Sequence, residues 1–151
     1  MRRLRVGFEH PEMRLNGSYW GRQGAGLLLL AGGKALLALR SEEVNEPGTW
    51  GIPGGKVEED EQAYDAALRE AQEELGPIPP HVVFGEVVFQ DGEFRYTTFL
   101  ARVRQKDAKG WKPRLNWEND EARWVKVSEL PDDLHFGLEF VMRERPDLFA
   151  P

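Results

Sequence analysis

The segment REAQEELG, residues 69–76, carries three glutamates at a spacing that can do chemistry. Glu70, Glu73 and Glu74 stand at positions i, i+3 and i+4, and the segment is rich in strong helix formers. On a helical wheel the three carboxylates fall within one face about 100° wide. Like charges at this spacing repel one another and weaken an isolated helix. Such a face therefore needs either solvent around it or a cation beside it.

Two interpretations of this acidic face are open from the helix alone. It can be a solvated surface, which is common in soluble proteins. It can instead hold a hard divalent cation, because Mg²⁺ and Mn²⁺ prefer oxygen ligands, and Mg²⁺ commonly takes one or two carboxylates together with substrate phosphates. Arg69 can pair with Glu73 four residues ahead, which would orient the helix surface.

A glycine-rich loop precedes the acidic helix and favours the metal interpretation. The segment WGIPGGK, residues 50–56, delivers two adjacent glycines toward the helix. Glycine lets the backbone approach a ligand closely and can expose a carbonyl oxygen to a metal ion. Arg40 and Lys56 offer positive charge for phosphate oxygens. Trp50 offers a ring on which a base could stack, although packing over a loop is the commoner outcome.

The elements that must position these groups follow from hydrophobic patterns and turn residues. Residues 25–31 and 34–40 are apolar runs joined by Gly-Gly, which predicts a β-hairpin with strands covered on both faces. The acidic helix is predicted over residues 61–75, with Asp60 as N-cap and Gly76 as its stop. Further strands are predicted at 81–90, 94–104 and 122–127, a polar loop at 106–119, and a closing helix at 138–145. Residues 1–24 are predicted to be an arm or one short strand.

Composition limits the function classes. The 151 residues fit one domain, and the absence of cysteine excludes disulfide frameworks and thiolate metal sites. A net charge of -6 argues against non-specific binding to nucleic acid. The most apolar segment is interrupted by glycines and a lysine, so no membrane span is expected. A cytoplasmic protein acting on a small molecule is expected, with a homodimer left open.

Residues 55–77, GKVEEDEQAYDAALREAQEELGP, resemble the Nudix box. All seven fixed positions of that box agree with this sequence: Gly55, Glu61, Arg69, Glu70, Glu73, Glu74 and Gly76. Two softer positions depart, because Ala71 is small and Pro77 stands where a larger aliphatic residue is usual. The preceding hairpin and residues 121–130 extend the resemblance to about residues 25–135.

The resemblance to the Nudix family implies an α/β fold, specifically an α/β/α sandwich with a mixed β-sheet. It implies hydrolysis of a nucleoside diphosphate linked to another moiety, with Mg²⁺ or Mn²⁺ as cofactor. The implied metal ligands are the carboxylates of Glu70, Glu73 and Glu74 and the backbone carbonyl of Gly55. Arg69 would support the catalytic groups electrostatically.

The general base is left open by the sequence. A base must take the proton of the attacking water, and Glu70 or Glu74 could do so beside the metal. Family members also use a glutamate outside the box, for which Glu121 is the candidate. A surface role for Glu121 is the alternative, and Glu118 and Asp120 are weaker rivals in the same loop.

The substrate is open as well, with nucleoside triphosphates preferred. ADP-ribose or other nucleotide sugars and dinucleoside polyphosphates are the alternatives; Tyr96 lies near, but not on, the position associated with the last class. A non-catalytic nucleotide-binding module of the same fold would have lost box glutamates, and none is missing. An isoprenoid diphosphate isomerase usually relies on a cysteine, which this chain lacks.

Overall fold

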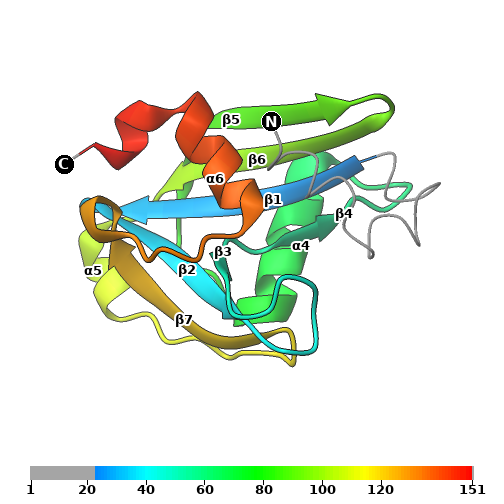
Figure 1. Cartoon of the computed structure of the whole chain (residues 1–151). Coiled ribbons are helices and arrows are strands. Elements are labelled where there is room, and N and C mark those ends of the chain that lie inside the picture. Colours follow the sequence, from blue (N-terminus) through cyan, green and yellow to red (C-terminus); the bar gives the residue numbers. More distant parts are fainter. Residues whose placement is uncertain (1–22, 151) are drawn as a thin grey trace.

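A mixed β-sheet forms the centre of the molecule (Figure 1). The structure is a computed structural model that describes residues 23–150. The strands are β1 (Gln23–Ala31), β2 (Lys34–Arg40), β3 (Trp50–Gly51), β4 (Gly54–Lys56), β5 (Val82–Asp91), β6 (Phe94–Arg102) and β7 (Asn119–Lys126). The α-helices are α4 (Ala63–Leu75), α5 (Gln105–Lys109) and α6 (Phe136–Glu144), and the 3₁₀ helices are η1 (Val127–Glu129) and η2 (Pro146–Phe149).

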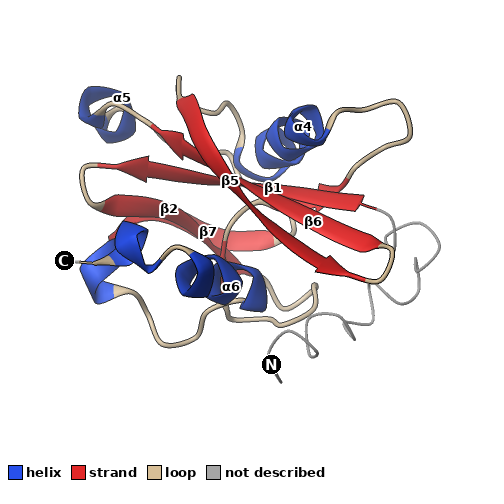
Figure 2. Cartoon of the chain, turned by 90° about the horizontal axis from the view of Figure 1, so that it is seen from above, coloured by secondary structure: helices blue, strands red, loops and turns tan. Residues whose placement is uncertain are grey.

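The strand order explains why the sheet is mixed. Five strands lie in the order β3-β2-β1-β6-β5, while β4 pairs with β1 and β7 pairs with β2. β1 and β6 run parallel, and the other pairs are antiparallel. Seen from above, α4 and α5 lie on one side of the sheet and α6 lies on the other (Figure 2). The predicted α/β/α sandwich with a mixed sheet is confirmed.

The leucine run of β1 is buried on both faces, as predicted. Leu27 and Leu29 join the core cluster that contains the apolar side of α4, and we call this the α4 face of the sheet. Leu28 and Leu30 join the cluster that contains α6, which we call the α6 face. Because successive side chains of a strand point to opposite faces, alternate residues of one strand pack against different helices.

The acidic helix begins later than predicted. Gln62, and not Asp60, occupies the N-cap position of α4. Glu61 lies outside the helix, and its carboxylate accepts two hydrogen bonds from Arg69. Gly76 ends the helix with a φ of 86°, a backbone conformation that favours glycine, as predicted. The glycine that ends the helix can be read from the sequence, whereas the residue at which the helix starts is predicted two positions too early.

Several smaller elements also differ from the predictions. The short helix α5 overlaps the start of the predicted polar loop at 106–119. The closing helix begins at Phe136, earlier than predicted, because His135 Nδ1 accepts a hydrogen bond from the Gly137 N–H and caps it. Of the predicted arm at residues 1–24, residues 1–22 lie outside the described residues, and β1 already includes 23 and 24. Within residues 23–150, no helix is long and apolar enough to cross a membrane.

Candidate active site

The two glycines of β4 lie directly against the acidic face of α4. A Cβ atom at Gly55 would come within 2.6 Å of the Glu70 Oε1 atom. The Gly54 N–H donates to the Glu74 Oε2 atom at 3.4 Å. Any larger residue at position 55 would displace the Glu70 carboxylate, so the Gly-Gly pair is what allows the acidic helix to sit this close to the sheet.

Arg69 ties the start of α4 to the loop before it. Its Nε and Nη2 atoms donate to the two oxygens of Glu61 at 2.7 and 3.1 Å. Nη1 donates to Glu70 at 3.1 Å and to Glu73 at 3.3 Å, and Nη2 also donates to the Lys56 carbonyl at 3.0 Å. The guanidinium lowers the pKa of the Glu61 carboxyl, chiefly through the hydrogen bond between them. Arg69 therefore holds two of the three helix carboxylates in place.

Glu74 is a buried carboxylate with uncharged partners. Its side chain is 7% exposed, and it accepts hydrogen bonds from Gly54 N–H and from Asn119 Nδ2, the latter at 3.2 Å. Burial, and next the negative charge of Glu118, raise its pKa to about 8. Burying a carboxylate without a cationic partner is costly. This part of the site therefore suits a positive ligand.

Glu70 lies beside Glu74, and its pKa is raised as well. Burial raises the pKa of Glu70 to about 7, although Arg69 acts against this rise. The charges of Glu73 and Glu118 contribute further in the direction of burial. Negative charge from two segments of the chain therefore converges on this pair of glutamates.

Glu118, a weaker rival of Glu121 for the base in the sequence analysis, lies close to the helix carboxylates. Its charge acts on both Glu70 and Glu74, and it directly precedes Asn119, which binds Glu74. Its side chain is positioned by a hydrogen bond from Asn116 Nδ2 at 3.0 Å, and its backbone carbonyl accepts from Ser41 N–H at 2.9 Å. The structure therefore brings Glu118 to the acidic cluster.

Glu121, by contrast, is not brought to this cluster. It pairs with Leu39 in the β2–β7 ladder, and Leu39 packs on the α6 face. The adjacent residue Ala122 packs on the α4 face, so strand alternation directs Glu121 away from α4. Its carboxylate is exposed and lies 3.5 Å from Arg123 Nε.

The three predicted substrate-binding residues have different surroundings. Arg40 pairs with Asn119 across β2 and β7, next to Glu74, and its Nε donates to the Asn45 carbonyl at 2.8 Å. Lys56 follows Gly55, and its Nζ lies 3.8 Å from Glu58. Both lie at the border of the acidic cluster. Trp50 is only 8% exposed and belongs to the α6-side core, so the structure does not bring it to the cluster.

The donor set fits a hard divalent cation chemically, but its side chains are not arranged as a ready shell. Carboxylate and carbonyl oxygens are the ligands that Mg²⁺ and Mn²⁺ prefer. Within residues 23–150, no three acidic or histidine side chains converge as a metal-ligand group. Glu73 is held by Arg69, and Glu74 by Gly54 and Asn119. Binding an ion here therefore requires side chains to turn toward it.

The raised pKa values predict how metal-free protein responds to pH. Both Glu70 and Glu74 have a folded-state pKa above their ordinary value of 4.5, so the folded state keeps protons that the unfolded state has released. Their contribution to stability is therefore complete below about pH 4.5 and is lost as the pH rises through about 7 to 8. In chelator, the Tm should fall by at least about 5 °C between pH 5 and pH 8.

Differential scanning calorimetry with and without Mg²⁺ or Mn²⁺ checks this expectation. At pH 8 the cation should restore most of the lost Tm, because it binds the ionised carboxylates of the folded state. The Glu74→Gln variant is the control and should show a flatter pH profile. An unchanged profile in that variant would mean that Glu74 does not titrate as inferred.

Comparison with known proteins identifies the family. The NUDIX domain profile matches residues 21–144. A Mycobacterium tuberculosis protein named "Putative 8-oxo-dGTP diphosphatase 3" is 36% identical over 135 residues, which cover 80% of this chain and 60% of the relative. The "Nucleoside triphosphate pyrophosphatase/Nudix hydrolase fusion protein" of Bifidobacterium longum is 34% identical over 124 residues, which cover 76% of this chain and 25% of the relative.

Solved structures agree with this match. The crystal structure of the Nudix hydrolase RenU from M. smegmatis superimposes with a TM-score of 0.63 at 29% identity, covering 86% of this chain and 88% of that chain. The chain spans between a quarter and three fifths of the length of the two relatives above. Because the domain profile covers most of the sequence and the fold agrees, this chain belongs to the Nudix hydrolase family.

Proposed function

We propose that this protein is a divalent-cation-dependent pyrophosphohydrolase that cleaves a phosphoanhydride bond of a nucleoside diphosphate linked to another moiety, with nucleoside triphosphates as preferred substrates. The observation that carries the proposal is Glu74, a buried carboxylate with two uncharged partners and two further carboxylates acting on it. The M. tuberculosis relative, whose name refers to 8-oxo-dGTP, supports the preference for triphosphates.

The proposed cofactor is Mg²⁺ or Mn²⁺. The residues that would hold it are Glu70, Glu73, Glu74 and the backbone carbonyl of Gly55. A bound cation supplies positive charge against the phosphate oxygens and lowers the pKa of water. Arg69 keeps Glu70 and Glu73 at the acidic cluster through its two hydrogen bonds, from which they would turn toward the cation. Arg40 and Lys56, at the border of the cluster, would bind phosphate oxygens that the cation does not reach.

The proton of the attacking water needs an acceptor, and we assign that role to Glu118. A carboxylate bound directly to a cation is a poor base, because the cation lowers its pKa. Glu118 lies outside the box ligands, yet close enough for its charge to act on Glu70 and Glu74. Glu121, the base predicted from sequence, projects from the opposite face of the sheet and is kept as the comparison residue.

Nucleotide sugars, including ADP-ribose, and dinucleoside polyphosphates are the alternative substrates, and a non-catalytic binding module is the remoter alternative. In each case the acidic cluster would bind the diphosphate through a cation. The alternatives therefore differ only in the group attached to the diphosphate. Retention of every fixed box residue favours catalysis over binding alone. The cytoplasmic location and the homodimer stay predictions.

A substrate panel tests the proposal. Protein stripped with chelator and dialysed should be inactive, and Mg²⁺ or Mn²⁺ should restore pyrophosphohydrolase activity, with products separated by chromatography. A nucleoside triphosphate should yield the monophosphate and pyrophosphate, with a higher kcat/KM than ADP-ribose or a dinucleoside polyphosphate. Full activity in excess chelator would contradict the metal role, and a higher kcat/KM for another class would contradict the substrate preference.

A further inference from the structure

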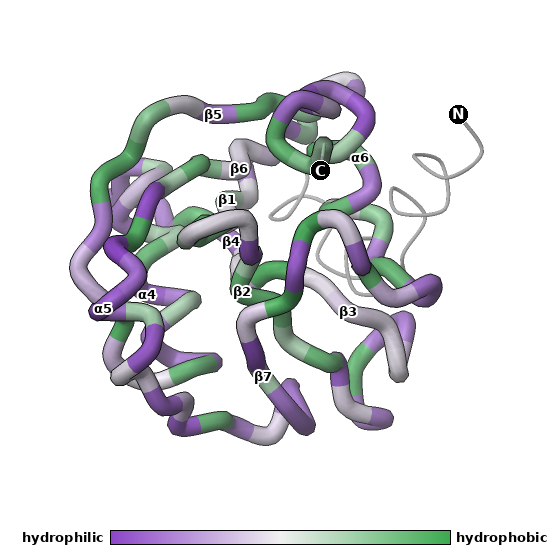
Figure 3. Tube along the Cα trace, turned by 90° about the vertical axis from the view of Figure 1, so that its left-hand side faces the viewer, coloured by the Kyte–Doolittle hydropathy of each residue, from purple (hydrophilic) through white to green (hydrophobic). Residues whose placement is uncertain are grey.

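Backbone hydrogen bonds dock the segment before β7 on the end of α4. The last carbonyls of an α-helix have no partner within the helix. At the end of α4, the Arg114 N–H donates to the Leu75 carbonyl at 2.7 Å, and the Asn116 N–H donates to the Glu74 carbonyl at 3.3 Å. The chain then enters β7 through a hydrophilic stretch, residues 118–121 (Figure 3). The backbone of Asn116 is therefore fixed beside the acidic cluster.

The Asn116 side chain holds Glu118 at two points. Its Oδ1 atom accepts a hydrogen bond from the Glu118 N–H, and its Nδ2 atom donates to the Glu118 Oε1 atom, both at 3.0 Å. Because a backbone N–H can only donate, the amide oxygen must face it, which leaves the amide nitrogen facing the carboxylate. The first bond forms a turn of the kind that asparagine favours. The second bond is not needed for that turn and acts on the Glu118 side chain alone.

Asn116 leaves one oxygen of Glu118 available. Within residues 23–150, the Glu118 Oε2 atom has no hydrogen-bond donor. The residue is half-buried, and its charge acts on both Glu70 and Glu74. A glutamate side chain otherwise samples several rotamers, and ordering it costs conformational entropy. The bond from Asn116 therefore selects one orientation of the carboxylate without neutralising its charge.

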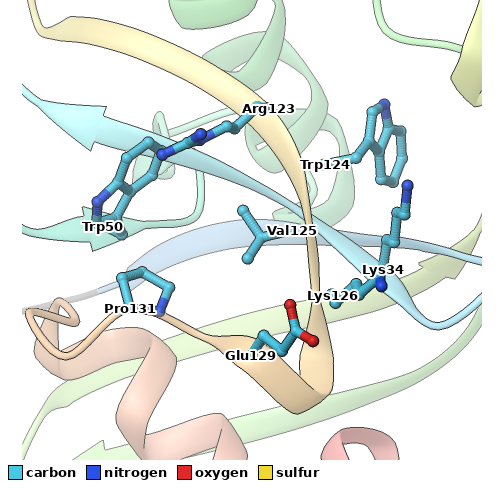
Figure 4. Close-up of a pocket in the computed structure, with 8 residues that line it drawn as sticks. All are labelled: Lys34, Trp50, Arg123, Trp124, Val125, Lys126, Glu129 and Pro131. Atoms are coloured by element: carbon cyan, nitrogen blue, oxygen red, sulfur yellow. The ribbon is translucent and has the colours of Figure 1, made fainter.

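Glu121 has the opposite kind of partner. Its carboxylate lies 3.5 Å from Arg123 Nε, and the Arg123 guanidinium carbon lies 4.9 Å from the ring centroid of Trp50, in the core of the α6 face (Figure 4). A cation that packs on the α6 face therefore pairs with Glu121, whereas an uncharged amide beside α4 holds Glu118. Of the two glutamates, only Glu118 combines a positioned carboxylate with a place next to the helix carboxylates.

We propose that Asn116 is a positioning residue for the proton acceptor: by donating to Glu118 Oε1, it orients the carboxylate so that Oε2 can take the proton of the attacking water. The inference rests on the proposed function, because Asn116 acts only through Glu118 and touches neither the cation nor the substrate. A base must lie within hydrogen-bond reach of the proton that it takes. Displacement of a catalytic group by about 1 Å can cost about a hundredfold in rate.

Two substitutions remove the donor and keep an acceptor for the turn. Asn116→Asp retains the oxygen that faces the Glu118 N–H, and Asn116→Ser retains a shorter one without adding charge, since a single hydroxyl cannot occupy both positions of the amide. Both variants should lower kcat for a nucleoside triphosphate about tenfold to a hundredfold, with KM within about twofold of wild type. The Mn²⁺ affinity of Asn116→Ser should also stay within about twofold.

Gln72→Glu is the matched control for the charge that Asn116→Asp adds. It places one further negative charge at an exposed position of α4 that does not face Glu118, and its kcat should stay within about twofold of wild type.

A double-mutant cycle shows whether the loss runs through Glu118. In the Glu118→Gln background the base is absent, so Asn116→Ser should change the residual kcat by less than about twofold. A merely structural role of Asn116 would instead lower kcat to the same extent in both backgrounds.

The outcomes separate this inference from the proposed function. If the wild type hydrolyses the nucleotide while both Asn116 variants keep kcat within about twofold, or if the loss is equal in the two backgrounds, the role of Asn116 is overturned and the proposed function stands. A loss of kcat matched by an equal loss of Mn²⁺ affinity would overturn it as well, because Asn116 would then act on the metal ligands. Failure of the wild type to hydrolyse any nucleotide with Mg²⁺ or Mn²⁺ would overturn the proposed function and, with it, the role of Asn116.

Discussion

Glutamine in place of Glu74 is expected to lower kcat by at least about a hundredfold while the protein stays folded. Glutamine matches the shape of the side chain, but its single carbonyl oxygen can accept only one of the two hydrogen bonds that Glu74 accepts from Gly54 N–H and Asn119. What it lacks is the negative charge that a hard cation needs in a ligand. The metal-free variant should also be more stable than the wild type at pH 8, because the buried charge is gone. Steady-state kinetics and thermal melts measure the two effects.

Variants at two other glutamates of the box are compared with Glu74→Gln. Glu73→Gln should also lose most turnover, although Glu73 is half exposed and its removal should change stability little. Glu59→Gln is the matched control, because Glu59 is an exposed residue of the box loop outside the fixed positions, and its kcat should stay within about twofold of wild type. Near wild-type rates in both Glu73→Gln and Glu74→Gln would show that the acidic face has no role in turnover.

The sequence predicts the acidic face but not the burial of Glu74. Helical spacing correctly separates an apolar face that includes Ala71 and Leu75 from the carboxylates, and both residues are buried against the sheet. The partners of Glu74 are Gly54 and Asn119, which stand 20 and 45 residues away in the chain. A local pattern contains no information about such contacts. The strongest physical argument for the site, a buried carboxylate whose hydrogen-bond partners are uncharged, therefore became available only from tertiary structure.

The location of Glu121 illustrates the same limit of sequence-based prediction. The β2–β7 pairing contains a register shift. Leu39 of β2 pairs with Glu121 of β7, while the next residue, Arg40, pairs with Asn119. Without this bulge, strict alternation would place residues 119 and 121 on the same face. The bulge turns Asn119 toward α4, where it binds Glu74, and leaves Glu121 on the α6 face. Sequence patterns of alternating polarity do not reveal a bulge, so the sequence could not show that Glu121 lies on the face of the sheet away from Glu74.

Glu118→Gln is expected to lower kcat at least about a hundredfold, whereas Glu121→Gln should stay within about fivefold of wild type, because proton transfer by a positioned side chain is worth typically 10²–10⁴-fold. The two glutamates lie three residues apart in one segment, and either change removes one negative charge. The difference in kcat between the two variants therefore reports the position of the carboxylate and not the loss of a charge. If Glu118 is the base and not a metal ligand, its variant should bind Mn²⁺ with nearly the wild-type affinity while the acidic limb of the pH–rate profile changes. A large loss in Glu121→Gln, with Glu118→Gln nearly unaffected, would return the role to the residue predicted from sequence; small losses in both would assign it to Glu70 or Glu74.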